Sequence, residues 1–596
     1  MPRPSLPPLF HAHKARASKT AIILTIVFAL LLSACTAPSS TTPTATPTLT
    51  KAPPSPTPSQ TALPTQTPTP TPVPLALTFW ADPSLPDDVR HQVSLPPGGS
   101  WVDKRDQATF ILVPKANNAD GKVLAETVWT YALVAPFLTV QDGVDSIDLQ
   151  TTLSGKVQEG AGLPVPNLLV REGDTTALFQ MLGVSPSATD SASMLQSVPG
   201  DYFQQESYPE DPAWAIVPFD QLTPTWKVLS VDGVSPLDIP YTPETYALQQ
   251  TYQLQLNDTV TQPLDENLKV QLAGALPAPN RDQAQLTSLV MTGVTAMTRD
   301  TAFAMYTEGV TYPATEIGGV LSSADLTHIS NEVSFYDDCP IPNPDYEGFI
   351  FCSDPAYMEL LKAVGADIIE LTGNHNNDVR ALYKVDSVPY TLDLYRKNGM
   401  QWYAGGTDLA SAQAPLLIEN KGNKLAFIGC NSYGPDMAWA RENSSGAAPC
   451  GDFVWLMDSI RDLKAQGYLP IVTFQYQEDY YRTATSSAKH DFRMVADSGA
   501  VIVNGSQSHV SKVMEFYGGA LVTYGLGNLF FDQPGYYITY PSIIQRHFFY
   551  NNKHISTQLI TIVVEETAKP RLMTDIERQA FLEELFTESE ALRRAQ

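Results

Sequence analysis

Residues 367–378 read DIIELTGNHNND and are the most informative stretch in the second half of the chain. Its first part, Asp367–Leu371, is mostly apolar and predicts a buried strand, while the Gly and Asn residues behind it predict a turn. The turn brings Asn374, His375 and Asp378 to the carboxyl end of the strand. Because layered α/β proteins assemble binding sites where buried strands end, we expect a polar site at this position.

Further predicted strands in this half also end in polar residues. They are Leu286–Thr292, Ala324–Glu332, Leu425–Gly429, Leu469–Phe474, Ala500–Val503 and Ala520–Tyr524. Helices are predicted between them, for example over Tyr357–Val364 and Val388–Lys397. This alternation predicts an α/β fold whose site is assembled from several strand ends.

The polar blocks resemble, in order and spacing, the motifs of the CapA family of poly-γ-glutamate capsule proteins. The blocks are Gly293-Val294, Ser330-Asn331-Glu332, Asn374-His375-Asn376-Asn377-Asp378, Gln475-Tyr476-Gln477-Glu478-Asp479, Gly505-Ser506-Gln507-Ser508-His509 and Gly525-Leu526-Gly527-Asn528-Leu529-Phe530-Phe531. The resemblance covers close to half of the chain. It implies a calcineurin-like metallophosphoesterase fold, a four-layer α/β/β/α sandwich, over residues 283–566.

The resemblance also implies a site for a divalent cation, with Mn, Fe or Zn as candidates. It assigns Glu332, Asn374 and His509 as metal ligands. His375 resembles the family's general acid, and Asp378 is placed to orient it. One hypothesis on this basis is a metal-dependent hydrolase or transferase of the phosphoesterase type, and the alternative, which we slightly favour, is a divergent or inactive catalytic site that lacks several of the expected metal ligands.

Three positions depart from the family pattern and predict a degenerate site. Val294 cannot coordinate a metal, and Gln475 and Gln507 replace histidines with neutral amides, which are poorer ligands for a transition metal. Glutamine nevertheless keeps a hydrogen-bond donor and an acceptor, so the site is expected to stay polar. The expected ligand-binding residues are Ser330, Gln475, Tyr476, Asp479, Gln507 and Asn528.

Three side chains near this site leave alternatives open. His328 shares a strand face with Ser330 and Glu332, because side chains alternate along a strand. It is either an extra ligand or a hydrogen-bonded histidine inside the sheet, and we favour the second. Of Glu478 and Asp479, one is expected to face the site, and Asp479 aligns with the family's glutamate.

The N-terminus predicts export and lipid anchoring. Residues 1–34 hold basic residues followed by an apolar run, as in a secretory signal peptide. The run ends in Leu32-Ser33-Ala34-Cys35, which resembles the bacterial lipobox and predicts lipidation of Cys35. Residues 35–74 are rich in Thr and Pro and are expected to be an extended linker. The protein is therefore expected on the extracytoplasmic face of the cell membrane, held by its lipid.

Two segments remain: a first body, residues 75–282, and a C-terminal tail, residues 567–596. Residues 75–282 mix strand-like runs with helical stretches over Leu124–Val134 and Thr175–Gly183, which predicts a separate α/β domain. Within it WTYALVAPFLTVQDGV (residues 129–144) faintly resembles the hinge of type 2 periplasmic solute-binding folds. Residues 567–596 are highly charged and predict a solvated terminal helix over Asp575–Arg594.

Net charge and cysteine content limit the possible partners and the cellular compartment. The formal net charge of −26 argues against a nucleic-acid partner. Four cysteines follow Cys35, and the short Pro- and Gly-rich loops between them favour the pairs Cys339–Cys352 and Cys430–Cys450 over other pairings or free thiols. Disulfides agree with an exported protein.

We therefore weigh three functions. The first is an envelope enzyme in the synthesis or handling of a capsule-like surface polymer. The second is a non-catalytic protein that binds a surface polymer or glycan, which the missing ligands would explain. The third, a solute-binding lipoprotein, depends on the first body alone.

Overall fold

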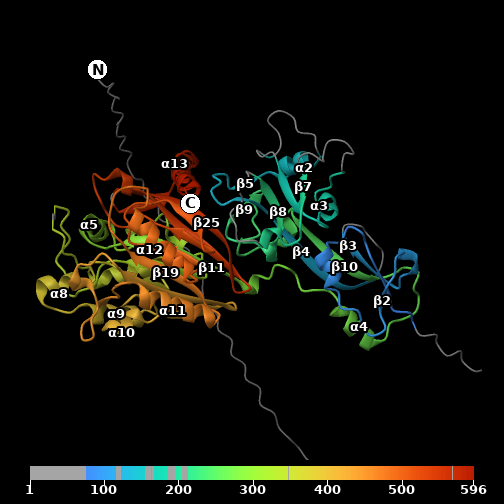
Figure 1. The fold of residues 1–596 in the computed structure, drawn as a ribbon, viewed down its shortest axis with the longest axis horizontal. Helices are drawn as coiled ribbons and strands as arrows, with labels where there is room; N and C mark the ends of the chain where they lie inside the picture. The colour runs from blue at the N-terminus through green and yellow to red at the C-terminus, as the bar shows by residue number, and fades with distance from the viewer. Residues whose placement is uncertain are drawn as a thin grey trace, which may run out of the picture. The chain divides into compact units, whose positions relative to one another are not determined.

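The computed structural model describes residues 75–115, 122–154, 163, 167–185, 195–204, 213–345, 348–566 and 568–595 (Figure 1). Residues 74–596 form one compact unit. The predicted signal peptide, the Thr/Pro-rich linker and the lipidation site Cys35 lie outside the described residues. No helix among the described residues is both long enough and apolar enough to cross a membrane.

The first half of the unit is built on one ten-stranded sheet with the order β2-β1-β3-β10-β4-β8-β6-β7, in which β9 pairs with both β4 and β5. Its strands are β1 Thr78–Ala81, β2 Ser100–Trp101, β3 Phe110–Pro114, β4 Val123–Pro136, β5 Gly143–Val144, β6 Leu168–Arg171, β7 Leu195–Val198, β8 Trp214–Pro218, β9 Trp226–Val231 and β10 Gln249–Leu256. The helices are α1 Asp87–His91, α2 Ser146–Ser154, α3 Thr175–Met181 and α4 Glu266–Ala273. This part is a mixed α/β structure, as the sequence predicts.

The helix predicted over Leu124–Val134 is wrong, because these residues lie in β4, the longest strand of this sheet. Trp129, Tyr131 and Leu133 are fully buried on one core, and Ala132 and Val134 are buried in another cluster. A strand that is buried on both faces shows no alternation of polar and apolar residues, so its sequence is hard to distinguish from a buried helix.

Two further sheets form the second half. The first has the order β14-β13-β12-β11-β24-β25-β26, with β23 paired to β11, and the second has the order β16-β17-β19-β20-β22-β21. The strands are β11 Leu286–Thr295, β12 Leu326–Asn331, β13 Ile368–Glu370, β14 Gln401–Tyr403, β16 Leu416–Asn420, β17 Asn423–Asn431, β19 Leu469–Gln475, β20 Ile502–Asn504, β21 Met514–Tyr517, β22 Ala520–Thr523, β23 Asn528–Phe530, β24 Pro541–Tyr550, β25 Lys553–Glu565 and β26 Lys569–Leu572. A small pair, β15 Gly405–Gly406 and β18 Gly446–Ala447, stands beside them.

Helices cover the outer faces of these two sheets. The helices of this half are α5 Arg299–Glu308, α6 Gly318–Leu321, α7 Met358–Ala363, α8 Asp378–Tyr383, α9 Val388–Lys397, α10 Leu409–Gln413, α11 Val454–Ala465, α12 Ser486–Asp497 and α13 Asp575–Arg594, of which α5, α7 and α9 cover one sheet and α11 and α12 the other. In Figure 1, α11 and α12 lie over the sheet that contains β19. The predicted helices over Tyr357–Val364 and Val388–Lys397 correspond to α7 and α9.

Three apolar cores define four layers. One core joins the sheet of β11 and β12 to α5, α7 and α9, and a second joins β17, β19 and β20 to α11 and α12. The third lies between the sheets, where Met291 and Ile368 of one sheet pack with Phe427 and Ile471 of the other. The predicted α/β/β/α sandwich is thus confirmed.

The parallel strands β11, β12 and β13 run in the same direction, as do β17, β19, β20 and β22. Their carboxyl ends therefore lie along one edge of each sheet. The backbone N–H of Glu332, just after β12, donates to the carbonyl of Thr295 at the end of β11 (2.9 Å). This edge carries the polar blocks found in the sequence.

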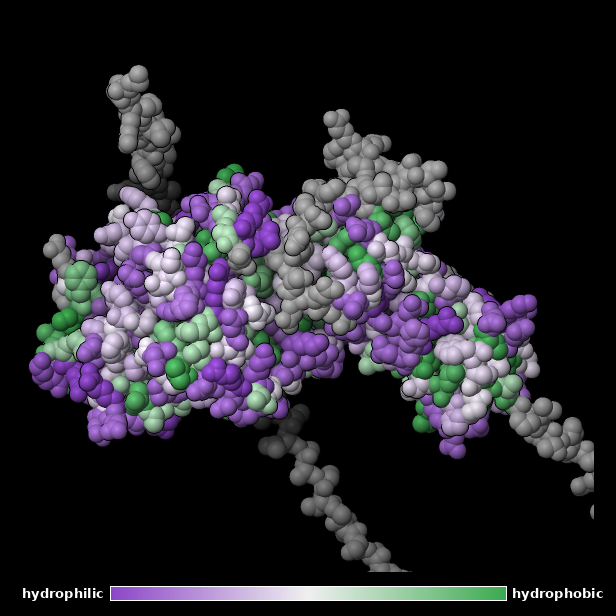
Figure 2. All heavy atoms as spheres, viewed as in Figure 1, coloured by the Kyte–Doolittle hydropathy of each residue, from purple (hydrophilic) through white to green (hydrophobic). Residues whose placement is uncertain are grey.

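The terminal helix α13 is more buried than its charge suggests. Phe581, Leu582, Leu585 and Phe586 pack on Met514 and neighbouring apolar residues. The helix is therefore amphipathic and packed on the sheet, and the expectation of a wholly solvated helix is corrected. On the face shown in Figure 2 hydrophilic residues predominate, in line with the high negative charge.

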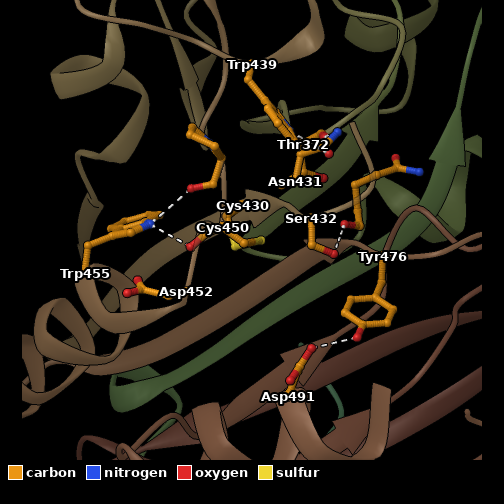
Figure 3. Close-up of a disulfide and its surroundings, with 12 residues drawn as sticks. Thr372, Cys430, Asn431, Ser432, Trp439, Cys450, Asp452, Trp455, Tyr476 and Asp491 are labelled. Atoms are coloured by element: carbon orange, nitrogen blue, oxygen red, sulfur yellow. Dashed lines mark hydrogen bonds between the residues drawn. A yellow bond between two sulfur atoms is a disulfide. The ribbon is translucent and has the colours of Figure 1, made fainter. Parts of the chain in front are cut away.

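Both predicted disulfides are present, Cys339–Cys352 and Cys430–Cys450. Figure 3 shows the second, at the end of β17. The next residue, Asn431, donates from Nδ2 to the carbonyl of Thr372 (2.8 Å) and accepts from the indole N–H of Trp439 (3.1 Å). The bridge thus fixes the end of β17 against the chain that leads into Asn374 and His375.

Removal of the buried bridge by the paired substitutions Cys430→Ala and Cys450→Ala is predicted to destabilise the protein. The bridge closes a 20-residue separation, and its loss is expected to lower the free energy of unfolding by about 2–4 kcal/mol. Urea unfolding followed by tryptophan fluorescence measures the change. An unchanged midpoint under non-reducing conditions would contradict this role.

Candidate functional site

The polar blocks meet at the carboxyl edge of the two central sheets. Glu332 follows β12, and Asn374 and His375 follow β13, both in the first sheet. Gln475 ends β19 in the second sheet, and His509 comes after β20. Segments that lie up to 177 residues apart in the chain touch here, as the hydrogen bond from Gln507 to Ser330 shows.

Two carboxylates and an imidazole form the centre of the site. One ligand atom from each of Glu332, Glu478 and His509 lies within 4.8 Å of the others, a spacing at which one metal ion can be held. His509 Nε2 lies 4.0 Å from Glu478 Oε2. Glu332 is 1% exposed, and burial raises the pKa of its carboxyl, although the nearby His375 and His509 oppose that shift.

Amide side chains surround the carboxylate of Glu478. Nδ2 of Asn374 and Nε2 of Gln475 both donate to Glu478 Oε1 at 3.3 Å. Gln507 donates from Nε2 to the hydroxyl of Ser330. The oxygens of all three amides are buried and have no hydrogen-bond partner within the described part of the chain. The site therefore holds several unsatisfied acceptors around two carboxylates.

His375 is positioned by its neighbours. Its Nδ1 lies 2.6 Å from Asp378 Oδ2, which also accepts the backbone N–H of Phe351 (2.9 Å). The ring of Phe351 packs on the imidazole at 4.6 Å between centroids. This arrangement directs the Nδ1 proton at Asp378 and leaves Nε2 facing Glu332, 3.9 Å away.

The surroundings keep His375 charged over a wider pH range. Burial lowers the pKa of His375, but the hydrogen bond to Asp378 and the charges of Glu332, Asp378 and Glu478 outweigh it. The pKa is therefore raised above its ordinary value of 6.5. A protonated imidazole with a free Nε2 edge can donate a proton to a bound oxygen.

His509 is oriented in a similar way. Its Nδ1 lies 2.9 Å from Asn528 Oδ1, and its ring stacks on Phe531 at 5.0 Å. Since the amide oxygen of Asn528 can only accept, His509 donates from Nδ1, and its Nε2 faces Glu478. Asn528, a predicted ligand-binding residue, thus lies behind His509 and orients its ring.

The opposite half of the site is apolar. Val294, Ala296, Val333, Phe351 and Phe531 pack together as a buried cluster. Val294 is fully buried and occupies a position where the family resemblance implies a metal ligand. The residues present therefore do not fit a two-metal centre, because Val294 offers no ligand and the described residues contain one group with the spacing of a metal site, Glu332, Glu478 and His509.

The remaining predicted residues lie elsewhere along the edge. Tyr476 donates to Asp491 (2.6 Å) and packs on Phe492 of α12, and Asp479 forms an ion pair with Lys512. Neither joins the carboxylate cluster. The acidic side chain that faces it is Glu478, next to the Asp479 that the family alignment indicates.

Two buried groups lie beneath the site, between the sheets. His328 Nε2 shares a hydrogen bond with the hydroxyl of Tyr403 (2.8 Å). Burial lowers the pKa of His328 to about 3. It is therefore a neutral histidine inside the sheet, the interpretation favoured above. Glu370 is fully buried, and the hydroxyls of Thr372 and Ser506 donate to it. Burial raises the pKa of Glu370. Sequence reasoning missed this residue, although a lone Glu in an otherwise apolar strand is a signal for it.

A cavity of about 380 Å³ adjoins the site at Phe351. It is lined by apolar residues such as Ile341 and Tyr383, by Arg299, and by the Cys339–Cys352 bridge. The volume is in the range of small-molecule sites, about 300–1,000 Å³. Because Phe351 lines the cavity and also contacts His375, a molecule held there would lie close to that imidazole.

The four-layer sandwich and its strand-edge site define a calcineurin-like metallophosphoesterase fold. Residues 288–533 match the family model for the bacterial capsule synthesis protein PGA_cap. These residues are accordingly similar to the CapA family at low identity, and the resemblance seen in the motifs is confirmed.

Two curated relatives are similar to this chain. It is 23% identical over 234 residues to the PGA biosynthesis protein CapA of Bacillus subtilis (strain 168), covering 39% of this chain and 60% of that protein. It is 21% identical over 216 residues to the capsule biosynthesis protein CapA of Bacillus anthracis, covering 36% of this chain and 52% of that protein. The chain thus matches little more than half the length of these relatives.

Two solved structures are distantly similar to this chain. A 5'-nucleotidase precursor from Thermus thermophilus is 12% identical, with a TM-score of 0.29 over 52% of this chain and 59% of that chain. An ABC-type phosphate transport receptor from Vibrio cholerae is 13% identical, with a TM-score of 0.23 over 28% of this chain and 75% of that chain. Scores this low support no conclusion, so the fold assignment depends on the layers, the strand order and the family match.

Asp378→Asn is predicted to lower the pKa of His375. The substitution removes the charge and the acceptor at Nδ1 that help to offset burial, so the pKa of His375 is expected to fall below that of the wild type. NMR titration of the His375 Cε1 proton in the cation-free protein measures this. Asp436→Asn, at an exposed position, is the control, and an unchanged pKa in Asp378→Asn would contradict the assigned pairing.

Proposed function

We propose that this protein is an exported, lipid-anchored member of the cell envelope that takes part in the synthesis or handling of a capsule-type surface polymer. The observation that carries the proposal is the match of residues 288–533 to the bacterial capsule synthesis family, together with a polar site at the expected strand ends. Both curated relatives are capsule or poly-γ-glutamate biosynthesis proteins by name.

The site supports a working rather than a vestigial role. A site that has lost its use has no reason to keep several buried polar groups, since each unsatisfied group costs about 1–3 kcal/mol. Here Glu332, His375 and His509 remain, with buried amides around them. His375 would protonate a leaving oxygen, Asp378 would hold its tautomer, and the cavity beside Phe351 would accept part of the substrate.

The anchor is proposed from the sequence. Leu32-Ser33-Ala34-Cys35 resembles a lipobox, and the Thr/Pro-rich segment behind it would separate the folded unit from the membrane. Both disulfides agree with folding in an oxidising compartment. The polymer would be met at the extracytoplasmic face.

Deletion of the gene in its own cell, followed by quantification of extracted surface polymer, tests the proposal. We expect polymer to fall, and to recover when the wild-type gene is returned. His375→Ala is expected to reduce that recovery, since a general acid contributes about 10²-fold or more to the rate of the chemical step. Cys35→Ala is expected to release the protein from the membrane fraction.

Two results would count against this function. Unchanged polymer in the deletion strain would remove the proposed role. Full recovery with His375→Ala would keep the role in polymer assembly but take the acid function away from this residue. Glu442→Gln, an exposed change, controls for expression.

A further inference from the structure

We infer that the site holds a single oxygen-preferring divalent cation of the Mn²⁺, Mg²⁺ or Ca²⁺ type, and that Glu478 is one of its ligands. The inference concerns the cation alone and does not depend on the proposed polymer. It starts from the disagreement between these residues and the two-metal centre that the fold implies.

The apolar half of the site excludes a second cation. Val294 and Ala296 lie among Val333, Phe351 and Phe531, and this cluster is buried from solvent. These five side chains carry no ligand atom, and among the described residues one group of acidic and imidazole side chains, Glu332, Glu478 and His509, has the spacing of a metal site. The cation must therefore lie on the side of Glu332, Glu478 and His509.

Glu478 takes the place of the missing imidazoles. Gln475 stands at a position where the family has a histidine. Its amide N–H donates to Glu478 Oε1 (3.3 Å). Asn374 donates to the same oxygen. These two bonds fix the carboxylate so that Oε2 faces His509 Nε2, 4.0 Å away. The side chain of Glu478 is thus held as a ligand by its neighbours.

The separations suit one cation. Two oxygens bound to a Ca²⁺ at about 2.3–2.6 Å lie at most about 5 Å apart, and the three ligand atoms lie within 4.8 Å of one another. The amide oxygens of Asn374 and Gln475 are buried beside the same carboxylate and have no partner among the described residues. A cation would satisfy these orphaned acceptors.

The donor set determines which cation fits. It consists of two carboxylates, two amide oxygens and one imidazole. Imidazole and thiolate favour Zn, Cu and Fe, whereas carboxylate and carbonyl oxygens favour Mg, Ca and Mn. Exchange of histidines for glutamines and recruitment of Glu478 therefore shift the preference of the site from transition metals toward hard cations.

Equilibrium dialysis of the full-length chain in detergent, with metal quantified by mass spectrometry, tests the inference. We expect one equivalent of Mn²⁺ per chain and at least a tenfold weaker Kd in Glu478→Gln. Glu442→Gln removes the same charge from an exposed loop and should bind as the wild type does. Spectra of bound Mn²⁺ by electron paramagnetic resonance give a readout that requires no activity.

A change in the metal preference of the site is the second test, in case the Glu478→Gln variant does not fold. Gln475→His restores an imidazole, so the ratio of Zn²⁺ to Mn²⁺ affinity is expected to rise at least tenfold over the wild type. The inference is overturned by two cations per chain, by no retained divalent cation, by unchanged Mn²⁺ binding in a folded Glu478→Gln variant, or by an unchanged ratio in Gln475→His.

Discussion

The carboxylate of Glu332 is almost completely buried, and the arrangement of the whole strand edge depends on it. A buried charge is tolerated only when opposite charges or donors surround it. Here His375 and His509 lie beside the carboxylate, and each imidazole is oriented by a partner of its own, Asp378 or Asn528. Since the site residues come from both central sheets, the sandwich must close before the charge can be compensated.

The same constraint links the site to the rest of the fold. Phe351 contacts His375 and lies within the loop that the Cys339–Cys352 bridge closes. Asn431, next to Cys430, holds the segment before Asn374. Both disulfides thus support chain segments that carry or contact site residues, and each restricts the movement of one side of the site.

The sequence predicted the strands of the second half well, because each is an apolar run that ends in polar residues. It failed at β4, where burial on both faces removes the alternation that separates a strand from a helix. It also treated α13 as solvated, because its charged residues hide the apolar face that packs on Met514. Such faces are decided by tertiary packing, which composition does not contain.

The sequence predicted which residues form the site, but it did not predict which of their side chains contact one another. The motifs indicate Glu332, His375 and His509 directly. Whether Glu478 or Asp479 faces the centre depends on the path of the chain after β19, and here Lys512 captures Asp479 while Asn374 and Gln475 capture Glu478. The proposed cation lies at one oxygen-rich position next to a packed apolar cluster. Crystals of the protein grown with Mn²⁺ and measured for anomalous scattering test it most directly. One anomalous peak between Glu332, Glu478 and His509 is predicted, and two peaks, or a peak beside Val294, would contradict it.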